Sequence, residues 1–241
     1  MIRGFYTARS GLLAQQENMN VVANNMANVN TVGYKSMKVS FTDLMYRNLN
    51  RATAEEPAIV GSGVKINKVD TNINQGPPQA TNNYLDFCIT GDGYFAVQNA
   101  EGETEYTRSG NFIMSIDESG GYWLAAANGE RVLNAEGEPI ELPLDESGTP
   151  QLDSSQIGVF GFSNPYGLSK LGDNRYIATN TSGEATALEN PSVKSGYLEG
   201  SGVEVSVEMV KVIESQRAFS FNSRMIQVAD EIEQTVNGLR Q

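Results

Sequence analysis

Histidine is absent from the 241-residue sequence, and cysteine occurs only once. Without histidine the chain lacks the commonest general base and the commonest metal ligand. A single cysteine excludes an internal disulfide and any CxxC metal or redox site. We therefore expect no Ser-His or Cys-His catalytic pair, no metal site and no cofactor.

Basic residues and long apolar runs are also scarce. The chain has 17 Lys and Arg against 29 Asp and Glu, a net charge of −12, which argues against a nucleic-acid partner. No apolar run approaches the roughly 20 residues that span a bilayer, so we expect no membrane insertion. The N-terminus has no unbroken apolar region typical of a cleavable secretory signal. Taken alone, these absences indicate a soluble cytoplasmic protein.

The apolar content, 39% with a further 24 glycines, is enough for a folded core. Residues 1–32 contain no proline, and their apolar side chains recur at an alternating spacing of three and four, which predicts an amphipathic helix over about 3–29. Several asparagines followed by Gly33 favour a helix end there. The spaced positions are Phe5, Ala8, Leu12, Met19, Val22, Met26 and Val29.

A second amphipathic helix is predicted over about 204–239. The 3-4 spacing is clear at its C-terminal end and less regular upstream, at Val210, Ile213, Ala218 and Phe221. Helices at both ends of the chain would pair with each other or with neighbouring molecules. The well-spaced positions are Met225, Ala229, Ile232, Val236 and Leu239.

The middle of the chain is rich in glycine, proline and turn signals, and predicts short strands. They are expected at 64–73, 85–97 with a turn at Asp92-Gly93, 105–116, 122–126, 156–162 and 175–178. The prediction is an α+β fold in which N- and C-terminal amphipathic helices form a coiled-coil-like inner domain around a central all-β domain. The helical domain comprises 1–35 and 203–241, a linker or extended hairpin region 36–63, and a β-rich outer domain 64–202.

Two other classes of protein are alternatives to a subunit that assembles with its neighbours through the terminal helices. Glycosidase chemistry needs two carboxylates about 5–10 Å apart, and Asp117/Glu118 and Asp145/Glu146 are candidate pairs. Both pairs lie in Glu-Ser-Gly turns, where solvated acidic residues are ordinary. An extracellular β-rich binding module is the other alternative, but it leaves both amphipathic termini without a role.

Motifs spread along the chain resemble those of the bacterial flagellar rod and hook axial proteins. The Asn-rich block near the N-terminus and the Gln-Arg-Ala-Phe block near the C-terminus are specific when found together. The motifs are ANNMAN at 23–28, TVGYK at 31–35, GDGYF at 91–95, YTRSG at 106–110, GYLE at 196–199 and IESQRAF at 213–219.

The resemblance implies a structural, non-enzymatic subunit of the flagellar basal-body rod. Such subunits polymerise into a hollow helical drive shaft that transmits torque to the hook and provides an export channel. The implied partners are further copies of the chain, other rod and hook axial proteins, and the flagellar type III export apparatus, with a rod cap and a ring bushing as further candidates. The implied location is the basal body outside the cytoplasmic membrane, reached without a cleavable signal.

Within the family the chain resembles distal rod subunits most, since hook proteins are usually longer. The segment 46–63 looks shorter than in typical distal subunits, which leaves a proximal rod or short hook-type protein open. Cys88, unusual in this family, is expected to pack in the core.

Two sets of residues follow from the helical pattern and the resemblance. The first is expected to form contacts between subunits, although its asparagines could instead be helix caps, its apolar members intrachain core and its arginine a solvated charge. The second forms the turn by which the chain leaves the first helix. The assembly set is Phe5, Leu12, Met19, Val22, Asn24, Asn25, Met26, Asn28, Arg217, Phe221, Met225, Ile232 and Val236; the exit turn is Thr31, Gly33, Tyr34 and Lys35.

Overall fold

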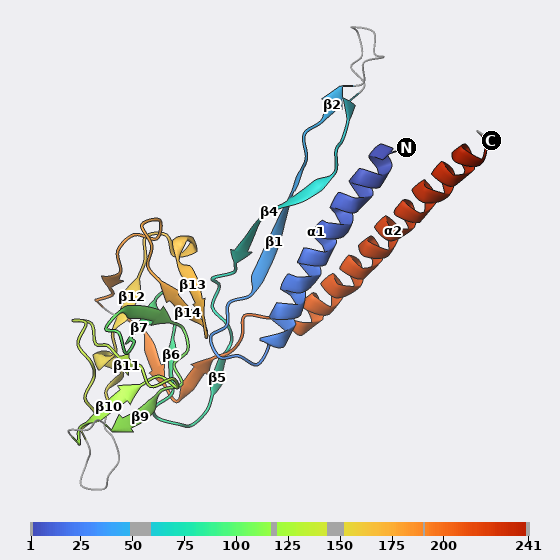
Figure 1. Cartoon of the computed structure of the whole chain (residues 1–241). Helices are drawn as coiled ribbons and strands as arrows, with labels where there is room; N and C mark the ends of the chain where they lie inside the picture. Colours follow the sequence, from blue (N-terminus) through green and yellow to red (C-terminus); the bar gives the residue numbers. More distant parts are fainter. Residues whose placement is uncertain (1, 49–58, 117–119, 144–151, 190, 240–241) are drawn as a thin grey trace. The chain divides into compact units, whose positions relative to one another are not determined.

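The computed structural model describes residues 2–48, 59–116, 120–143, 152–189 and 191–239 (Figure 1). It contains an N-terminal helix, a C-terminal helix and a mostly β centre, as the sequence predicted. The chain forms two compact units. Unit 1 comprises Met1–Ala27, Met37–Thr71 and Glu204–Gln241, and unit 2 comprises Asn28–Ser36 and Asn72–Val203.

Unit 1 is built on two long helices, α1 (Ile2–Ala27) and α2 (Val205–Gly238), which lie side by side and run antiparallel (Figure 1). Asn18 Nδ2 donates to Ser215 Oγ at 2.8 Å across their interface. At Gly11 the two helices approach so closely that a Cβ would lie 2.8 Å from the Asn222 side chain. The ends differ from the expected ones by one or two residues, which is ordinary for asparagine-rich helix ends.

A long β-ribbon completes unit 1. Strand β1 (Met37–Asp43) pairs antiparallel with β4 (Val64–Thr71), and β2 (Arg47–Asn48) pairs with β3 (Ile59–Val60) further along. Helix α1 contacts both β1 and β4. The expected boundary at residue 64 therefore differs from the structure, in which β4 belongs to the helical unit because its pairing partner is β1.

The largest sheet of unit 2 has nine strands, of which seven follow the order β13-β14-β8-β7-β11-β10-β9, while β12 pairs with β7 and β15. These strands are β7 (Tyr94–Gln98), β8 (Thr104–Thr107), β9 (Ile113–Ile116), β10 (Tyr122–Ala125), β11 (Arg131–Val132), β12 (Val159–Gly161), β13 (Ser169–Gly172), β14 (Arg175–Ile177) and β15 (Thr186–Ala187).

Two further antiparallel pairs complete the β structure of unit 2. One joins β6 (Phe87–Ile89) to β16 (Val193–Ser195), and the other joins β5 (Pro78–Ala80) to β17 (Tyr197–Glu199). Two single-turn 3-10 helices, η1 (Ser154–Gln156) and η2 (Pro165–Gly167), lie among the strands. The single strand expected at 105–116 is wrong: the structure has β8 and β9 there, separated by residues 108–112.

The core of unit 2 is apolar and largely aromatic. Phe87, Phe95 and Phe112 are almost fully buried, and the rings of Phe95 and Phe112 meet edge to face with centroids 5.2 Å apart. A second cluster contains Tyr94, Tyr106 and Tyr176. Cys88 is 1% exposed in β6, where burial raises the pKa of its thiol, so its surroundings are those of a core residue.

Candidate assembly surface

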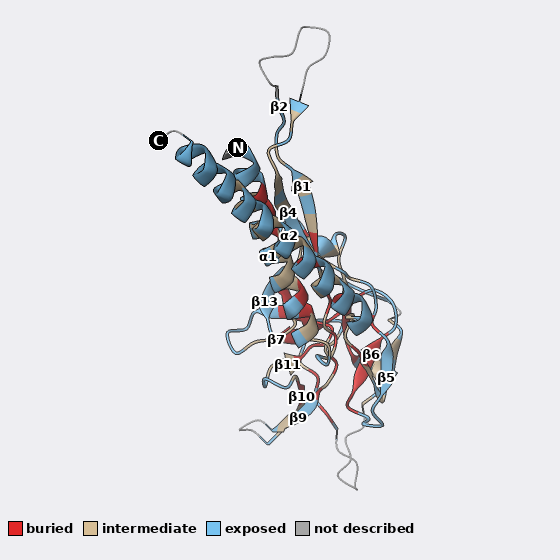
Figure 2. Cartoon of the chain, turned by 90° about the vertical axis from the view of Figure 1, so that its right-hand side faces the viewer, coloured by how far each residue is buried: buried red, intermediate tan, exposed pale blue. Residues whose placement is uncertain are grey.

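Helix α2 presents Ser215 and Asn222 toward α1, with half-buried Val212 and Ile226 on the same side, and leaves most of its other large apolar residues exposed. Ser215 is buried and hydrogen-bonded to α1, and Asn222 faces Gly11. Most of the helix is exposed (Figure 2). The exposed large apolar residues of α2 are Val205, Val207, Met209, Val210, Ile213, Phe219, Phe221, Met225, Val228, Ile232 and Val236, and Leu239 follows directly after the helix. A soluble helix normally shows the opposite arrangement.

The outward residues form a continuous stripe in the second half of α2. Phe221, Met225, Val228 and Ile232 follow a spacing of four, three and four, which keeps them on one side of the helix. The exposed fractions of Phe221 and Met225 are 66% and 56%. Complete burial of each such side chain contributes about 1.5–3 kcal/mol, so covering this stripe would stabilise an assembly strongly.

The stripe expected on α1 is only partly covered within the chain. Val22 is buried, as is the spaced Ala8. The assembly candidates Leu12, Met19 and Met26 are half-buried, whereas 39% of Phe5 is exposed. Some of these residues therefore contribute to the core of unit 1, and all except Ala8 and Val22 keep surface for a neighbouring molecule.

The three candidate asparagines lie in different surroundings. The side chain of Asn25 is fully buried and pairs with the backbone of one residue: its Nδ2 donates to Met37 O at 2.8 Å, and its Oδ1 accepts from Met37 N at 2.9 Å. Asn25 thereby joins the last turn of α1 to the start of β1. Asn24 is exposed, and half-buried Asn28 accepts a hydrogen bond from Thr31 Oγ1.

The exit turn centres on Glu199, which the sequence did not single out. Gly33, with φ +66°, donates its N–H to Glu199 O at 2.8 Å, and Lys35 Nζ donates to Glu199 Oε1 at 2.6 Å. Thr31 is exposed, and the carbonyl of half-buried Tyr34 accepts from Gly202 N. The turn is thus held by residues that are more than 160 positions away in the chain.

Arg108 completes a buried charge cluster with Lys35 and Glu199. Its Nη1 lies 3.2 Å from Glu199 Oε2, and each of the three side chains is 1% exposed. Burial lowers the pKa of Lys35, and the negative charge of Glu199 opposes that effect. The cluster joins the motifs at 31–35, 106–110 and 196–199. The only feature of the sequence that could have indicated this cluster is the single charged residue in each of these motifs.

The remaining candidates lie on α2. Arg217, Ile232 and Val236 are exposed, like Phe221 and Met225. The structure thus places five of the thirteen assembly candidates on the exposed side of one helix. Their contacts with other subunits stay a prediction.

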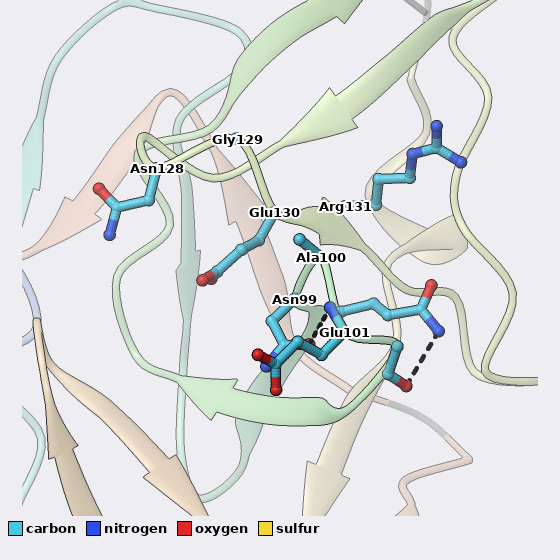
Figure 3. Close-up of a pocket in the computed structure, with 9 residues that line it drawn as sticks. Asn99, Ala100, Glu101, Asn128, Gly129, Glu130 and Arg131 are labelled. Atoms are coloured by element: carbon cyan, nitrogen blue, oxygen red, sulfur yellow. Dashed lines mark hydrogen bonds between the residues drawn. The ribbon is translucent and has the colours of Figure 1, made fainter.

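A cavity of about 590 Å³ lies in unit 2 between the turns at 99–102 and 128–131 (Figure 3). Its polar groups hold the turns themselves: Asn99 Oδ1 accepts from Glu101 N at 2.9 Å, and Gln98 Nε2 donates to Gly102 O at 3.4 Å. Glu130 is paired with Arg175. This arrangement stabilises two hairpins and leaves few polar groups for a ligand.

Three other sequence questions concern chemistry. The carboxylate pairs Asp117/Glu118 and Asp145/Glu146 lie outside the described residues. Among the residues that are described, no cluster of three His, Cys, Asp or Glu could hold a metal ion. The helices of that same part of the chain are too short or too polar to cross a membrane.

A terminal helix that leaves most of its large apolar residues exposed, as α2 does, is typical of the class of subunits that are completed by assembly. Three family models match the chain: "Flagella basal body rod protein" over 5–35, "Flagellar hook protein FlgE/F/G D1 domain" over 88–159 and "Flagellar basal body rod FlgEFG protein C-terminal" over 194–239.

Full-length relatives agree. The flagellar basal-body rod protein FlgG of Bacillus subtilis (strain 168) is 35% identical and covers 100% of both chains. FlgG of Caulobacter vibrioides is 35% identical over 97% of this chain and 98% of its own. The flagellar hook-basal body complex protein FlhP of Bacillus subtilis is 24% identical over 100% of both.

The chain belongs to the flagellar basal-body rod protein family and is a structural subunit of the rod. The family is one of structural proteins, and membership implies self-assembly, association with other rod and hook proteins, and a place in the flagellar basal body.

Proposed function

We propose that copies of this chain polymerise through the outward faces of α1 and α2 into a hollow helical shaft. The shaft would transmit torque to the hook, and its bore would serve as the export channel. The observation that carries the proposal is the apolar stripe of α2 from Phe221 to Val236, whose side chains remain 42–66% exposed within the described chain. Packing such 3-4 stripes against each other gives a coiled-coil-like inner layer.

The apolar stripe gives the sharpest test. Phe221→Asp and Met225→Asp should leave monomer stability within about 0.5 kcal/mol of the wild type, because both side chains are already exposed. Both should abolish recovery of the chain in isolated basal bodies and abolish swimming. Ser220→Asp, at an exposed polar position of the same helix, is the matched control. Normal rods in either stripe variant would contradict the proposal.

Half-buried positions of α1 need a second readout. Charged substitutions at Leu12 or Met26 should also abolish rod assembly and motility, but part of each side chain contributes to unit 1. Far-ultraviolet circular dichroism of the purified variant separates loss of the fold from loss of assembly. A variant that folds normally and still builds rods would remove that residue from the assembly surface.

We infer a position in the distal rod, because identity to FlgG is 35% and to FlhP only 24%, over full length in both cases. Locating the labelled chain along isolated basal bodies tests this position against the proximal rod and the hook. The same preparation shows whether a rod cap or a ring bushing lies against the chain.

We infer further that the flagellar type III apparatus exports the chain without cleaving a signal. Support comes from the family and from the single cysteine, since a chain without disulfides can be threaded unfolded. The mass of the chain recovered from basal bodies should be that of the uncut sequence. A shortened N-terminus, or normal recovery from cells that lack the exporter, would contradict this route.

A further inference from the structure

The seven-strand order of the large sheet in unit 2 ends in two exposed strands, β9 and β13. They lie on opposite sides of unit 2 in both views (Figure 1 and Figure 2). We propose that the β9 edge of one copy packs against the β13 edge of a second copy, together with the adjoining helix η2. The inference rests on the proposed function and deepens it, because it adds a contact between copies that does not involve the terminal helices.

Exposed apolar side chains gather at these two edges. Among the described residues of unit 2, eight large apolar side chains are exposed, and five of them lie in β9, η2 or β13. Groups of exposed apolar side chains mark sites of contact with other proteins. The five residues, which are 39–70% exposed, are Ile113, Met114 and Ile116 in β9, Tyr166 in η2 and Leu171 in β13.

Charge limits where two copies of unit 2 can meet. Unit 2 contains 18 acidic and 6 basic residues, a net charge of −12, whereas unit 1 has equal numbers of each. Strand β9 has no charged residue, and 154–172, which includes η2 and β13, is the longest part of unit 2 without an acidic residue. Two copies therefore repel each other least where these two edges face each other.

The charges beside the two edges do not oppose this pairing. The only charged residue of 154–172 is Lys170, and Asp117 follows β9 in the sequence with the opposite sign. Asp173, which follows β13, is paired with Arg175 at 3.4 Å. By contrast, a branch of the sheet ends in β15, which lies between Glu184 and Glu189 in the sequence. Strand β15 is therefore a poorer partner for an acidic unit.

The requirement for a continuous shaft selects β13, not a second β9, as the partner of β9. Contact of β9 with β9 would be two-fold symmetric and would end at a pair of copies. A contact between β9 and β13 joins two different surfaces, so each end of the pair keeps one free edge to which a further copy can bind. Repeating this contact extends the assembly.

Side chains, not a continuous backbone ladder, make this contact. Strand β9 has neither a charge nor a proline, so its edge is unprotected. Strand β13 carries Lys170 and a register shift between Lys170 and Gly172, and both features oppose the addition of a strand. The apolar side chains of β9 therefore pack against the Tyr166 ring and Leu171.

Cysteine cross-linking in isolated rods tests the contact. In a Cys88→Ser background, Met114→Cys combined with Leu171→Cys should give a ladder of oligomers under mild oxidation, because each copy offers one thiol at each edge. The matched control combines Met114→Cys with Thr186→Cys, an exposed position of β15. The control should give at least tenfold less cross-linked product.

The outcomes separate this inference from the proposed function. A ladder confined to the Leu171 pair supports the contact. Rods that form normally but show no ladder, or equal ladders with both pairs, overturn the contact and leave the rod function standing. If the wild-type chain is absent from isolated basal bodies, the proposed function itself fails.

Charges placed at the two edges give an independent measurement. Met114→Lys alone and Leu171→Asp alone should each lower recovery of the chain in rods about tenfold, because a charge replaces an apolar group in the contact. Combining them should restore part of the recovery, since the new charges are opposite. Thr186→Asp should change nothing. Fluorescence of Trp123, which pairs with Ser115 of β9, verifies the fold. Unchanged recovery in both single variants would overturn the contact.

Discussion

Glu199→Ala should destabilise unit 2 more than any exposed substitution. In the native chain the Glu199 carboxylate accepts hydrogen bonds from Lys35 Nζ at 2.6 Å, from Gly76 N at 2.8 Å and from Arg108 Nη1 at 3.2 Å. It is also the acidic partner of both buried cations. The substitution removes these bonds and leaves two positive charges among apolar and aromatic residues.

The size of the effect follows from that burial. Breaking a buried ion pair by removing one partner costs about 3–5 kcal/mol. Lys35 can limit the loss by giving up its proton, because burial already lowers its pKa from 10.5. For a lysine whose pKa is still 10.5, neutralisation at pH 7 costs about 5 kcal/mol. Arg108 stays charged under all ordinary conditions. We expect the free energy of unfolding of unit 2 to fall by about 3–5 kcal/mol.

Urea denaturation of the full chain, followed by tryptophan fluorescence, measures this loss. The single tryptophan, Trp123, lies in β10 of the nine-stranded sheet and therefore reports on unit 2. The control is Glu184→Ala, an exposed acidic position of unit 2, which should cost less than about 1 kcal/mol. If Glu199→Ala costs no more than this control, the buried cluster does not stabilise unit 2 as argued.

Three further predictions concern buried groups. Burial raises the pKa of Tyr176 above its usual 10.0. The neutral hydroxyl therefore contributes its full stability below pH 10, and this contribution is lost as the pH rises toward the higher pKa of the folded state. Denaturation at several pH values should show that the free energy of unfolding falls above pH 10, and falls less in Tyr176→Phe. Asn25→Ala leaves the N–H and C=O of Met37 without their partner, at a cost of about 1–3 kcal/mol; unchanged hydrogen exchange at the Met37 amide would contradict this role. The side chain introduced by Gly11→Val would overlap that of Asn222, so the substitution should separate α1 from α2 and lower the midpoint of unfolding of the helices. An unchanged midpoint would show that the interface can adjust.

Short-range sequence patterns correctly predicted the elements that are determined by residues close together in the chain. The 3-4 spacing and the asparagines near Gly33 gave both helices to within two residues, and the turn at Asp92-Gly93 separates β6 from β7 as expected. The strand expected at 175–178 is β14. In each case the residues that decide the structure are neighbours in the sequence.

Elements that depend on distant partners could not be predicted in the same way. Strand β17 forms only because β5, 117 residues earlier at Tyr197↔Ala80, lies beside it, and neither three-residue segment shows alternation of its own. The apolar stripe of α1 was identified, but sequence alone could not tell that Val22 would be buried and Phe5 exposed. The charge cluster was missed because nothing local joins positions 35, 108 and 199.

The buried charge cluster of Lys35, Arg108 and Glu199 has a consequence for the order in which unit 2 can fold. Lys35 and Glu199 are 164 residues apart, so the two cations are present in the growing or emerging chain long before their only shared anion. Ordering a loop of that length without its closing contact is entropically unfavourable, and two unneutralised charges oppose burial in the meantime. In any process in which the N-terminus emerges first, unit 2 therefore cannot finish folding until the last fifth of the chain has emerged.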